Sequence, residues 1–372
     1  MMIHLLTNFS CGFILILLLQ LLKPCWVIGV ELEAQSDGII EIVDIQTPPF
    51  LEQSPKTLHW QKEIEKIGSH YLRLHIRNVQ GFDIDNTILE LRTRGGRLVR
   101  EYTGEELRTQ RSFWTRVIPG DYVLISLFAP TAPIGSSLSI DQIAYQVYSG
   151  APLSTYGKDE KEPISNYSND PTIEAVERSV ARLYFIQNGE SKTCTGFLIE
   201  SGQLLTNHHC VNTQEVCETT VAVFGFQYGS NGLLNLGEQF DCGEMVSAKN
   251  SYELDYALLD IKGTPSTKWG TLNLSDGDPE IDLPLFIVQH PGGLPKQISK
   301  INCRAVAVPV DGRGEQTDFS HTCDTVGGSS GSPVLNESGQ VVGLHHYGFG
   351  EAGEWEENRA IRMNRIIEHL SF

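Results

Sequence analysis

The stretch Thr325–Val334 reads TVGGSSGSPV and sets three serines among three glycines, closed by a proline. Clusters of Gly, Ser and Pro are usually turns or flexible loops, so this stretch alone predicts no more than a loop. A serine hydroxyl becomes a nucleophile when other parts of the chain supply a base and a group that orients the base. The rest of the sequence therefore decides whether one of these hydroxyls takes part in chemistry.

Two other stretches supply those groups. Leu204–Cys210 reads LLTNHHC, an apolar strand that ends in two histidines, and Leu254–Leu259 reads LDYALL, with an acid at the start of an apolar strand. Taken singly, each is a common polar end of a strand. In the order His, Asp, Ser, the three stretches together meet the needs of nucleophilic serine catalysis, because a base takes the hydroxyl proton and an acid fixes the tautomer of the base.

With these motifs, residues 172–372 resemble the chymotrypsin-fold serine peptidases, and more closely their bacterial V8-like, trypsin-like branch. The matching motifs stand in the family order: TNHHCV, DYALLDI, CDTVGGSSGSPV and VVGLHHYG. The resemblance implies an all-β fold, a chymotrypsin-like double β-barrel of two six-stranded barrels with the site in the cleft between them. The sequence adds a C-terminal helix over Asn364–Leu370. The implied activity is that of a serine endopeptidase, which acts on a polypeptide substrate without a metal or an organic cofactor.

The family pattern assigns roles to residues of this chain. Ser330 matches the nucleophile, His209 matches the base, and Asp255 matches the acid that orients the base. The backbone N–H groups of Gly328 and Ser330 would form the oxyanion hole, which stabilises the tetrahedral intermediate. Ser329 stands where trypsin-type zymogens carry an aspartate that receives the new amino terminus, so that activation ion pair cannot form here.

Three further residues bear on the choice of the substrate residue before the cleaved bond, called P1. Thr325 and His345 match the threonine and histidine with which V8-like glutamyl peptidases hold a P1 carboxylate. Asp324 instead matches the pocket-floor acid of trypsin, which selects Arg or Lys. A carboxylate beside an acidic substrate side chain would repel it, so the two pockets exclude each other. We expect an acidic P1 residue, with a basic P1 residue as the alternative.

The cysteines indicate an oxidising compartment. The chain has eight, of which Cys11 and Cys25 fall in the N-terminal apolar region, and the six others form an even set downstream. None stands in a Cys-x-x-Cys arrangement, so a zinc site is not expected. The family resemblance implies a Cys194–Cys210 disulfide beside the base. The other four allow three pairings, of which the one joining residues close in sequence is expected: Cys217–Cys242 and Cys303–Cys323.

The length of 372 residues favours two or three domains. Residues 1–29 contain an apolar run too short for a membrane span, which predicts a signal peptide, with an uncleaved anchor as the alternative. Export would place the protein in a secreted, periplasmic or extracellular location. The formal net charge of −18 makes nucleic acid and anionic membrane surfaces poor partners.

Residues 40–148 are predicted to form a small β-sandwich accessory domain. Residues 72–77 alternate apolar and polar side chains, and residues 88–91 and 122–128 also read as strands. The segment faintly resembles the pre-peptidase C-terminal domains of secreted bacterial hydrolases, and nothing in it indicates a ligand. Residues 149–171, rich in Ser, Pro, Asn and Asp, are predicted to be a linker to the peptidase domain at 172–372.

Two other functions fit less well. The sequence GSSGS is close to the G-x-S-x-G motif of α/β-hydrolases, but Ser332 replaces the last glycine, and that class has its acid and histidine after the serine. A catalytically inactive peptidase fold that serves as a binding module is the second alternative. Such modules usually lack a member of the triad, and none is missing here.

Overall fold

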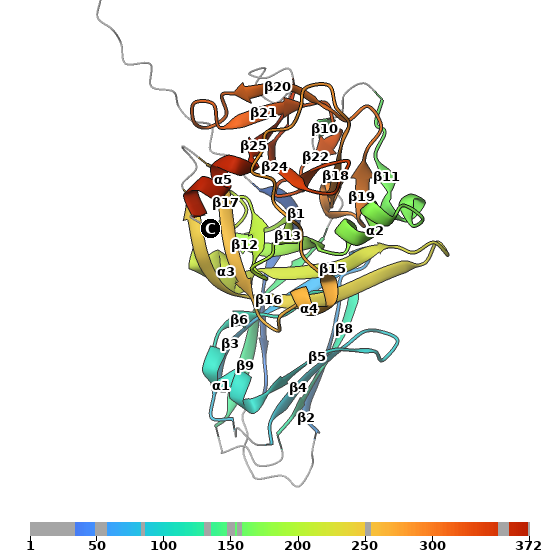
Figure 1. Ribbon diagram of the computed structural model, residues 1–372. Coiled ribbons are helices and arrows are strands. Elements are labelled where there is room, and N and C mark those ends of the chain that lie inside the picture. Colours follow the sequence, from blue (N-terminus) through green and yellow to red (C-terminus); the bar gives the residue numbers. More distant parts are fainter. Residues whose placement is uncertain are drawn as a thin grey trace, which may run out of the picture. The chain divides into compact units, whose positions relative to one another are not determined.

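The computed structural model describes residues 34–48, 58–82, 86–129, 135–146, 153–154, 158–249, 254–348 and 357–370 (Figure 1). Residues Glu33–Phe372 form one compact unit. The predicted signal peptide, 1–29, lies outside the described residues, together with Cys11 and Cys25. Among the helices that the structure does describe, none has the length and apolar character needed to cross a membrane.

A closed β-barrel of six strands holds the His and Asp stretches. Its strands follow the order β12-β15-β16-β17-β14-β13, and a further pairing between β12 and β13 closes the ring. Apolar side chains such as Leu183, Leu204 and Phe224 are fully buried in its core. The strands are β12 (Val180–Gln187), β13 (Glu190–Leu198), β14 (Leu204–Thr206), β15 (Val221–Tyr228), β16 (Leu234–Lys249) and β17 (Tyr256–Ile261).

A second barrel holds the Ser stretch. Its strands follow the order β18-β23-β24-β25-β21-β20, and a bridge between Pro284 and Arg304 brings the start of β18 to the start of β20. One apolar cluster contains residues from both barrels and from the C-terminal helix, including Leu205, Leu344 and Ile366. The elements are β18 (Leu285–Gln289), β19 (Gln297–Ser299), β20 (Ala305–Val310), β21 (Asp318–His321), β22 (Thr325–Val326), β23 (Pro333–Asn336), β24 (Val341–Tyr347), β25 (Asn358–Arg362) and α5 (Met363–Leu370). The expected all-β fold with two barrels and a C-terminal helix is confirmed.

The residues before the barrels form two sheets that enclose their own apolar core. One sheet has the order β1-β9-β3-β6, with β7 paired to β3, and the other has the order β2-β8-β4-β5. Leu74, Leu89 and Ile125 are fully buried in the shared core, so the arrangement is a β-sandwich. Its strands are β1 (Gln35–Gln46), β2 (Leu58–Glu65), β3 (Tyr71–Gln80), β4 (Ile88–Arg92), β5 (Leu98–Thr103), β6 (Phe113–Trp114), β7 (Ile118–Pro119), β8 (Tyr122–Phe128) and β9 (Ser137–Tyr145).

Strand β1 pairs with a strand of the sandwich and with a strand of the first barrel. Its first residues pair antiparallel with β13, and from Ile39 onward it pairs with β9. Gly38 stands at the change of partner, where an added β-carbon would lie 2.4 Å from the carbonyl oxygen of Tyr145. Only glycine lets the two backbones approach so closely. The sequence analysis did not foresee this shared strand.

Four helices besides α5 occur in the described ranges, and all are short. The clearest is α1, where the Thr103 hydroxyl accepts from the Glu106 N–H and the Glu106 carboxylate accepts from the Thr103 N–H. This capping box was visible in the sequence as a threonine three residues before a glutamate. The four are α1 (Gly104–Gln110), α2 (Pro171–Glu177), α3 (Gln214–Thr219) and α4 (Ser266–Trp269), and two 3₁₀ turns are η1 (Ile164–Tyr167) and η2 (Pro291–Gly293).

The segment predicted as a linker contains ordered elements that contact the second barrel. Strand β10 (Leu153–Ser154) pairs with β22, and β11 (Glu162–Pro163) pairs with β19. Ile164 is 3% exposed and belongs to the apolar cluster between the barrels. The described residues of this segment are therefore attached to the barrels, and the domain limits drawn from composition stay a prediction.

Candidate active site

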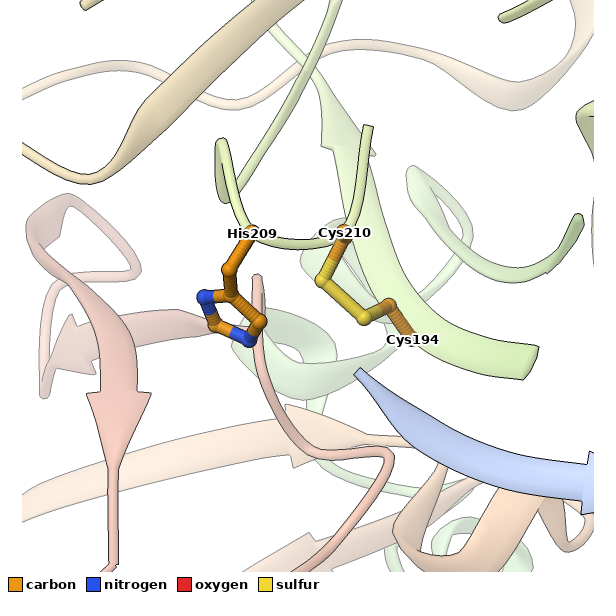
Figure 2. Close-up of side chains that lie close together, drawn as sticks. All are labelled: Cys194, His209 and Cys210. Atoms are coloured by element: carbon orange, nitrogen blue, oxygen red, sulfur yellow. A yellow bond between two sulfur atoms is a disulfide. The ribbon is translucent and has the colours of Figure 1, made fainter. Parts of the chain in front are cut away.

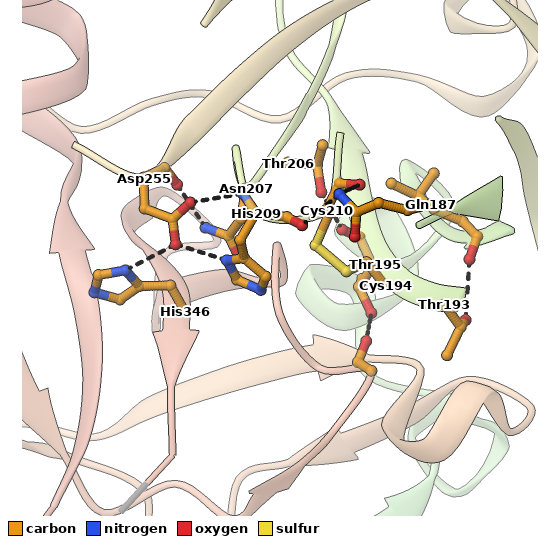
Figure 3. The surroundings of a disulfide bond; sticks show 12 residues. Gln187, Thr193, Cys194, Thr195, Thr206, Asn207, His209, Cys210, Asp255 and His346 are labelled. Carbon is orange, nitrogen blue, oxygen red and sulfur yellow. Dashed lines mark hydrogen bonds and ion pairs between the residues drawn. A yellow bond between two sulfur atoms is a disulfide. The ribbon is translucent and has the colours of Figure 1, made fainter. Parts of the chain in front are cut away.

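Two adjacent strands bring His209 and Asp255 together. Strands β14 and β17 are antiparallel, with Thr206 opposite Ala257, so the end of β14 and the start of β17 lie at the same edge. The His209 Nδ1 atom lies 2.6 Å from Asp255 Oδ2, and the His209 backbone N–H donates to Asp255 Oδ1 at 2.9 Å (Figure 3). Both carboxylate oxygens therefore hold the same histidine.

Asp255 is fully buried, and its surroundings favour the carboxylate form. Burial alone would raise the pKa of Asp255, but the charge and hydrogen bond of His209 and the contact with His346 outweigh it and hold this pKa well below its usual value. The side chain of Asn207 donates to the Asp255 backbone carbonyl at 2.8 Å, which fixes the start of β17 (Figure 3). An ionised, immobile acid is thus in place to orient the histidine.

A disulfide lies directly beside the histidine. Cys194 of β13 is bonded to Cys210, the neighbour of His209 (Figure 2). The ligand atoms of these three residues lie within 4.8 Å of one another, but both sulfurs are in the disulfide, so they are not thiolate ligands for a metal. The other disulfides join Cys217 to Cys242 and Cys303 to Cys323, so the expected pairings are confirmed.

The loop that carries Ser330 is held against β13 by Thr195. The Thr195 N–H donates to the Ser330 carbonyl at 2.8 Å, and the Thr195 hydroxyl donates to the Gly328 carbonyl at 2.9 Å. Thr195 follows Cys194 in the chain, and His209 precedes Cys210. The Ser330 loop and His209 are therefore each held next to one cysteine of the same disulfide. Within the described residues no hydrogen bond joins the Ser330 hydroxyl to the His209 ring, and such bonds are often long until substrate binds.

The backbone before Ser330 presents free N–H groups. Gly328 has a φ of 93°, and the Gly327 carbonyl accepts from the Gly292 N–H at 2.6 Å. In a planar trans peptide the N–H points away from the C=O, so the Gly328 N–H points away from Gly292. In the described part of the chain, no acceptor is bonded to the N–H of Gly328 or of Ser330. The Pro-Gly-Gly at 291–293 marks a turn in the sequence, but the contact of this turn with the Ser330 loop was not foreseen.

Two of the three predicted P1-binding residues, Thr325 and His345, are buried polar side chains without a charge. Thr325 is 1% exposed, and its hydroxyl oxygen has no partner among the described residues. His345 is also buried, and its Nδ1 lies 3.2 Å from Nε2 of His321. Burial, followed by the charges of His321 and other nearby histidines, holds the pKa of His345 well below its usual value, so this imidazole is neutral.

Asp324 occupies a different environment. Its carboxylate accepts from the backbone N–H of Glu160 at 2.8 Å, and its backbone carbonyl accepts from Gln289 and Ser299. The residue is 4% exposed. One carboxylate oxygen is thus bonded to the segment between the sandwich and the barrels.

His346 and Asp318 continue the network behind Asp255. His346 Nδ1 lies 3.4 Å from Asp255 Oδ2 (Figure 3). The Nε2 atom of His346 lies 2.6 Å from Asp318 Oδ2. Burial alone would lower the pKa of His346, but the Asp318 charge and the bonds to both carboxylates raise it. Asp318 comes from a strand with no motif, so only the fold reveals this contact.

The comparisons with known proteins give one family match over part of the chain and several relatives. Residues 194–344 match the family described as the trypsin-like peptidase domain. The chain is 32% identical over 203 residues to the secreted RxLR effector protein 73 of Plasmopara viticola, a match that covers 52% of this chain and 50% of that protein. It is 25% identical over 326 residues to the lysyl endopeptidase of Pseudomonas aeruginosa, covering 80% and 69% of the two chains. It is 24% identical over 204 residues to the glutamyl endopeptidase of Staphylococcus epidermidis, covering 52% and 66%. The chain thus spans about half the length of the first of these relatives.

Proposed function

Since residues 194–344 match the trypsin-like peptidase domain family, we propose that the protein is a serine endopeptidase that works through Ser330, His209 and Asp255. The observation that carries the proposal is the His209–Asp255 pair, in which the backbone N–H and the ring Nδ1 of His209 each contact one carboxylate oxygen of Asp255. This pair lies beside the Cys194–Cys210 disulfide, and the Ser330 loop is hydrogen-bonded to β13, the strand that contains Cys194. Base and acid are therefore preorganised, and the serine loop is attached next to them.

In this mechanism, Ser330 attacks the carbonyl carbon of the substrate peptide bond. His209 takes the hydroxyl proton and then delivers it to the leaving amine, while Asp255 stays ionised and stabilises the imidazolium. The low pKa of Asp255 supports that role, because the acid remains charged throughout. A water molecule then hydrolyses the acyl-enzyme with His209 again as the base.

The N–H groups of Gly328 and Ser330 serve as the oxyanion hole. They have no acceptor among the described residues, and the bonds from Gly292 to the Gly327 carbonyl and from Thr195 to the Gly328 carbonyl fix the backbone around them. Donors that are fixed before the reaction need no reorganisation in the transition state, and losing one costs roughly 3 to 4 kcal/mol in related sites.

The pocket beside Ser330 is proposed to prefer an acidic P1 residue. A substrate carboxylate would pair with the buried Thr325 hydroxyl, which has no other described partner, and with His345, whose pKa the incoming charge would raise. The glutamyl endopeptidase of Staphylococcus epidermidis is among the relatives.

A basic P1 residue is the second candidate, because the lysyl endopeptidase of Pseudomonas aeruginosa is also a relative. It would need the Asp324 carboxylate on the pocket floor, whereas that carboxylate accepts a bond from Glu160.

Export and the division into an accessory domain at 40–148 and a peptidase domain at 172–372 belong to the same proposal. Three disulfides fit an oxidising compartment outside the cytoplasm. The sandwich has its own buried core, which supports a separate role for it.

The test is a set of peptides that differ only at P1. Purified protein should cleave after Glu, Ser330→Ala should lose this activity, and the neighbouring variant Ser332→Ala should keep most of it. Serine-directed phosphonylating reagents should inactivate the protein through Ser330. Cleavage after Lys or Arg instead of Glu would support the second candidate, in which Asp324 selects a basic P1 residue. Undiminished cleavage by Ser330→Ala would exclude the assigned nucleophile.

A further inference from the structure

The segment that leads into the barrels is fixed on the second barrel. Strand β11 pairs antiparallel with β19, and Glu162 stands opposite Ile298 (Figure 1). The Ile164 N–H donates to the Lys296 carbonyl at 3.3 Å, and Ile164 is buried in the apolar cluster that contains residues of both barrels. Residues 158–162 are therefore held against the second barrel at their carboxyl end.

Glu160, in the middle of this segment, contacts the chain neighbours of both cysteines of one disulfide. Its backbone N–H donates to Asp324 Oδ2 at 2.8 Å, and its carboxylate accepts from the Asn302 side chain at 2.6 Å. Asp324 follows Cys323 and Asn302 precedes Cys303, and these two cysteines are bonded to each other. The same disulfide therefore holds both partners of Glu160 in place.

The main chain of Asp324 is fixed as well. Its carbonyl accepts from the Gln289 side chain at 2.9 Å and from the Ser299 hydroxyl at 2.6 Å. With the main chain fixed and one carboxylate oxygen bonded to the Glu160 N–H, the Asp324 side chain has a defined direction. The next residue, Thr325, has a buried hydroxyl with no partner among the described residues. Of these two candidates for binding the P1 side chain, the hydroxyl is available and the carboxylate is engaged.

The bond from Glu160 disfavours a basic P1 residue. A backbone N–H bonded to a carboxylate is a charge-assisted hydrogen bond, which is stronger than a bond between neutral groups. To pair with a P1 Lys or Arg, the Asp324 carboxylate would have to turn away and leave this N–H unpaired. An acidic P1 residue needs no such change, and it meets no second carboxylate as long as Asp324 stays bonded to Glu160.

We propose that the backbone N–H of Glu160 sets the P1 specificity by holding the Asp324 carboxylate away from the P1 side chain. Thr325 and His345 are then left to bind an acidic residue. Glu160 is a positioning residue in this scheme, because it acts through Asp324 and touches no substrate. This role rests on the serine endopeptidase function and the acidic pocket proposed above.

The first variant is Glu160→Pro, because proline has no N–H to donate. Without this donor, the Asp324 carboxylate becomes free to pair with a substrate cation. The kcat/KM ratio of a P1 Lys peptide to the matched P1 Glu peptide should rise by about 10- to 100-fold, the equivalent of one hydrogen bond to a charged group. The control Glu160→Gln keeps the N–H and an acceptor for Asn302, so its ratio should stay within about twofold of the wild type.

The second variant removes the charge that the first one frees. Glu160→Pro combined with Asp324→Asn should again prefer Glu, because an amide neither attracts a substrate cation nor repels a substrate carboxylate. Asp324→Asn alone should also prefer Glu over Lys, and this measurement does not depend on whether proline at position 160 allows folding. A folded Glu160→Pro protein with the wild-type ratio would overturn the proposal, and so would a preference for Lys in Asp324→Asn.

The wild type separates this role of Glu160 from the function on which it rests. A wild type that cleaves after Lys or Arg but not after Glu would refute the role of Glu160 and leave the peptidase function intact. A wild type that cleaves no peptide and whose Ser330 does not react with phosphonylating reagents would refute the peptidase function itself.

Discussion

Replacing Thr195 with valine should impair catalysis more than binding. The Thr195 hydroxyl is fully buried, accepts from the His290 N–H at 3.0 Å and donates to the Gly328 carbonyl at 2.9 Å. Valine keeps the shape and removes both bonds. The His290 N–H and the Gly328 carbonyl would both be left unpaired, each at a cost of about 1 to 3 kcal/mol, so the free energy of unfolding should fall by about 2 to 6 kcal/mol.

The catalytic effect follows from the position of Gly328. Its carbonyl is the group that Thr195 holds, and a loop free to turn at this point no longer presents its N–H groups to the developing oxyanion. The loss of one oxyanion donor costs roughly 10²- to 10³-fold in kcat, and partial misalignment should cost about 10- to 100-fold. KM should change by less than about threefold, because the P1 pocket is untouched.

The assay is steady-state cleavage of the best P1 peptide, with urea unfolding measured on the same samples. Thr195→Ser keeps the hydroxyl and should retain most of the wild-type kcat. Thr220→Val is the matched control, since the buried Thr220 hydroxyl donates to the Val216 carbonyl at 2.8 Å, in the first barrel but at the end of α3. If Thr195→Val and Thr220→Val lose similar stability and both keep the wild-type kcat, the Thr195 hydroxyl does not position the oxyanion loop.

Three other changes have defined outcomes. Asp255→Asn should lower kcat by about 10⁴-fold, because an amide stabilises the wrong tautomer of His209, and an unchanged kcat in the peptide assay would contradict the assigned role. The raised pKa of His346 means that its charged form stabilises the fold fully below about pH 6.5, and this stabilisation is lost as the pH rises through the folded-state pKa. The difference in unfolding free energy between wild type and His346→Gln should therefore shrink as the pH rises above about 6.5, and a constant difference would argue against a charged His346. Replacing both Cys217 and Cys242 with serine should lower the unfolding free energy by about 3 kcal/mol in urea while the triad keeps its activity, and inactivation of a still-folded variant would contradict this.

The parts of the site that the sequence predicted are those carried by short local motifs. His209, Asp255 and Ser330 each stand in a recognisable stretch, and the cysteine pairings followed from resemblance and proximity along the chain. The contact between His209 and Asp255 then results from the pairing of two neighbouring strands.

The parts that could not be predicted depend on contacts between residues far apart in the chain. Gly292 supports the oxyanion loop, and Asp318 binds His346, yet neither residue stands in a motif that indicates its partner. The pairing of β1 with β13 was missed for the same reason: no residue pattern in β1 indicates which strand it pairs with. Helix α1 is different, since its capping box was present in the sequence and was overlooked.

The shared strand β1 also bears on the order in which the chain folds. It is the first described strand to be synthesised, yet its partners β9 and β13 come much later in the chain. Until both exist, its backbone groups stay unpaired, and its exposed Ile39 and Ile42 add to the risk that it pairs with another molecule. Such long-range pairing is slow, so β1 should dock late in folding, when it completes the sandwich and joins it to the first barrel. A chain stalled before that step would present an unprotected edge and be prone to aggregate.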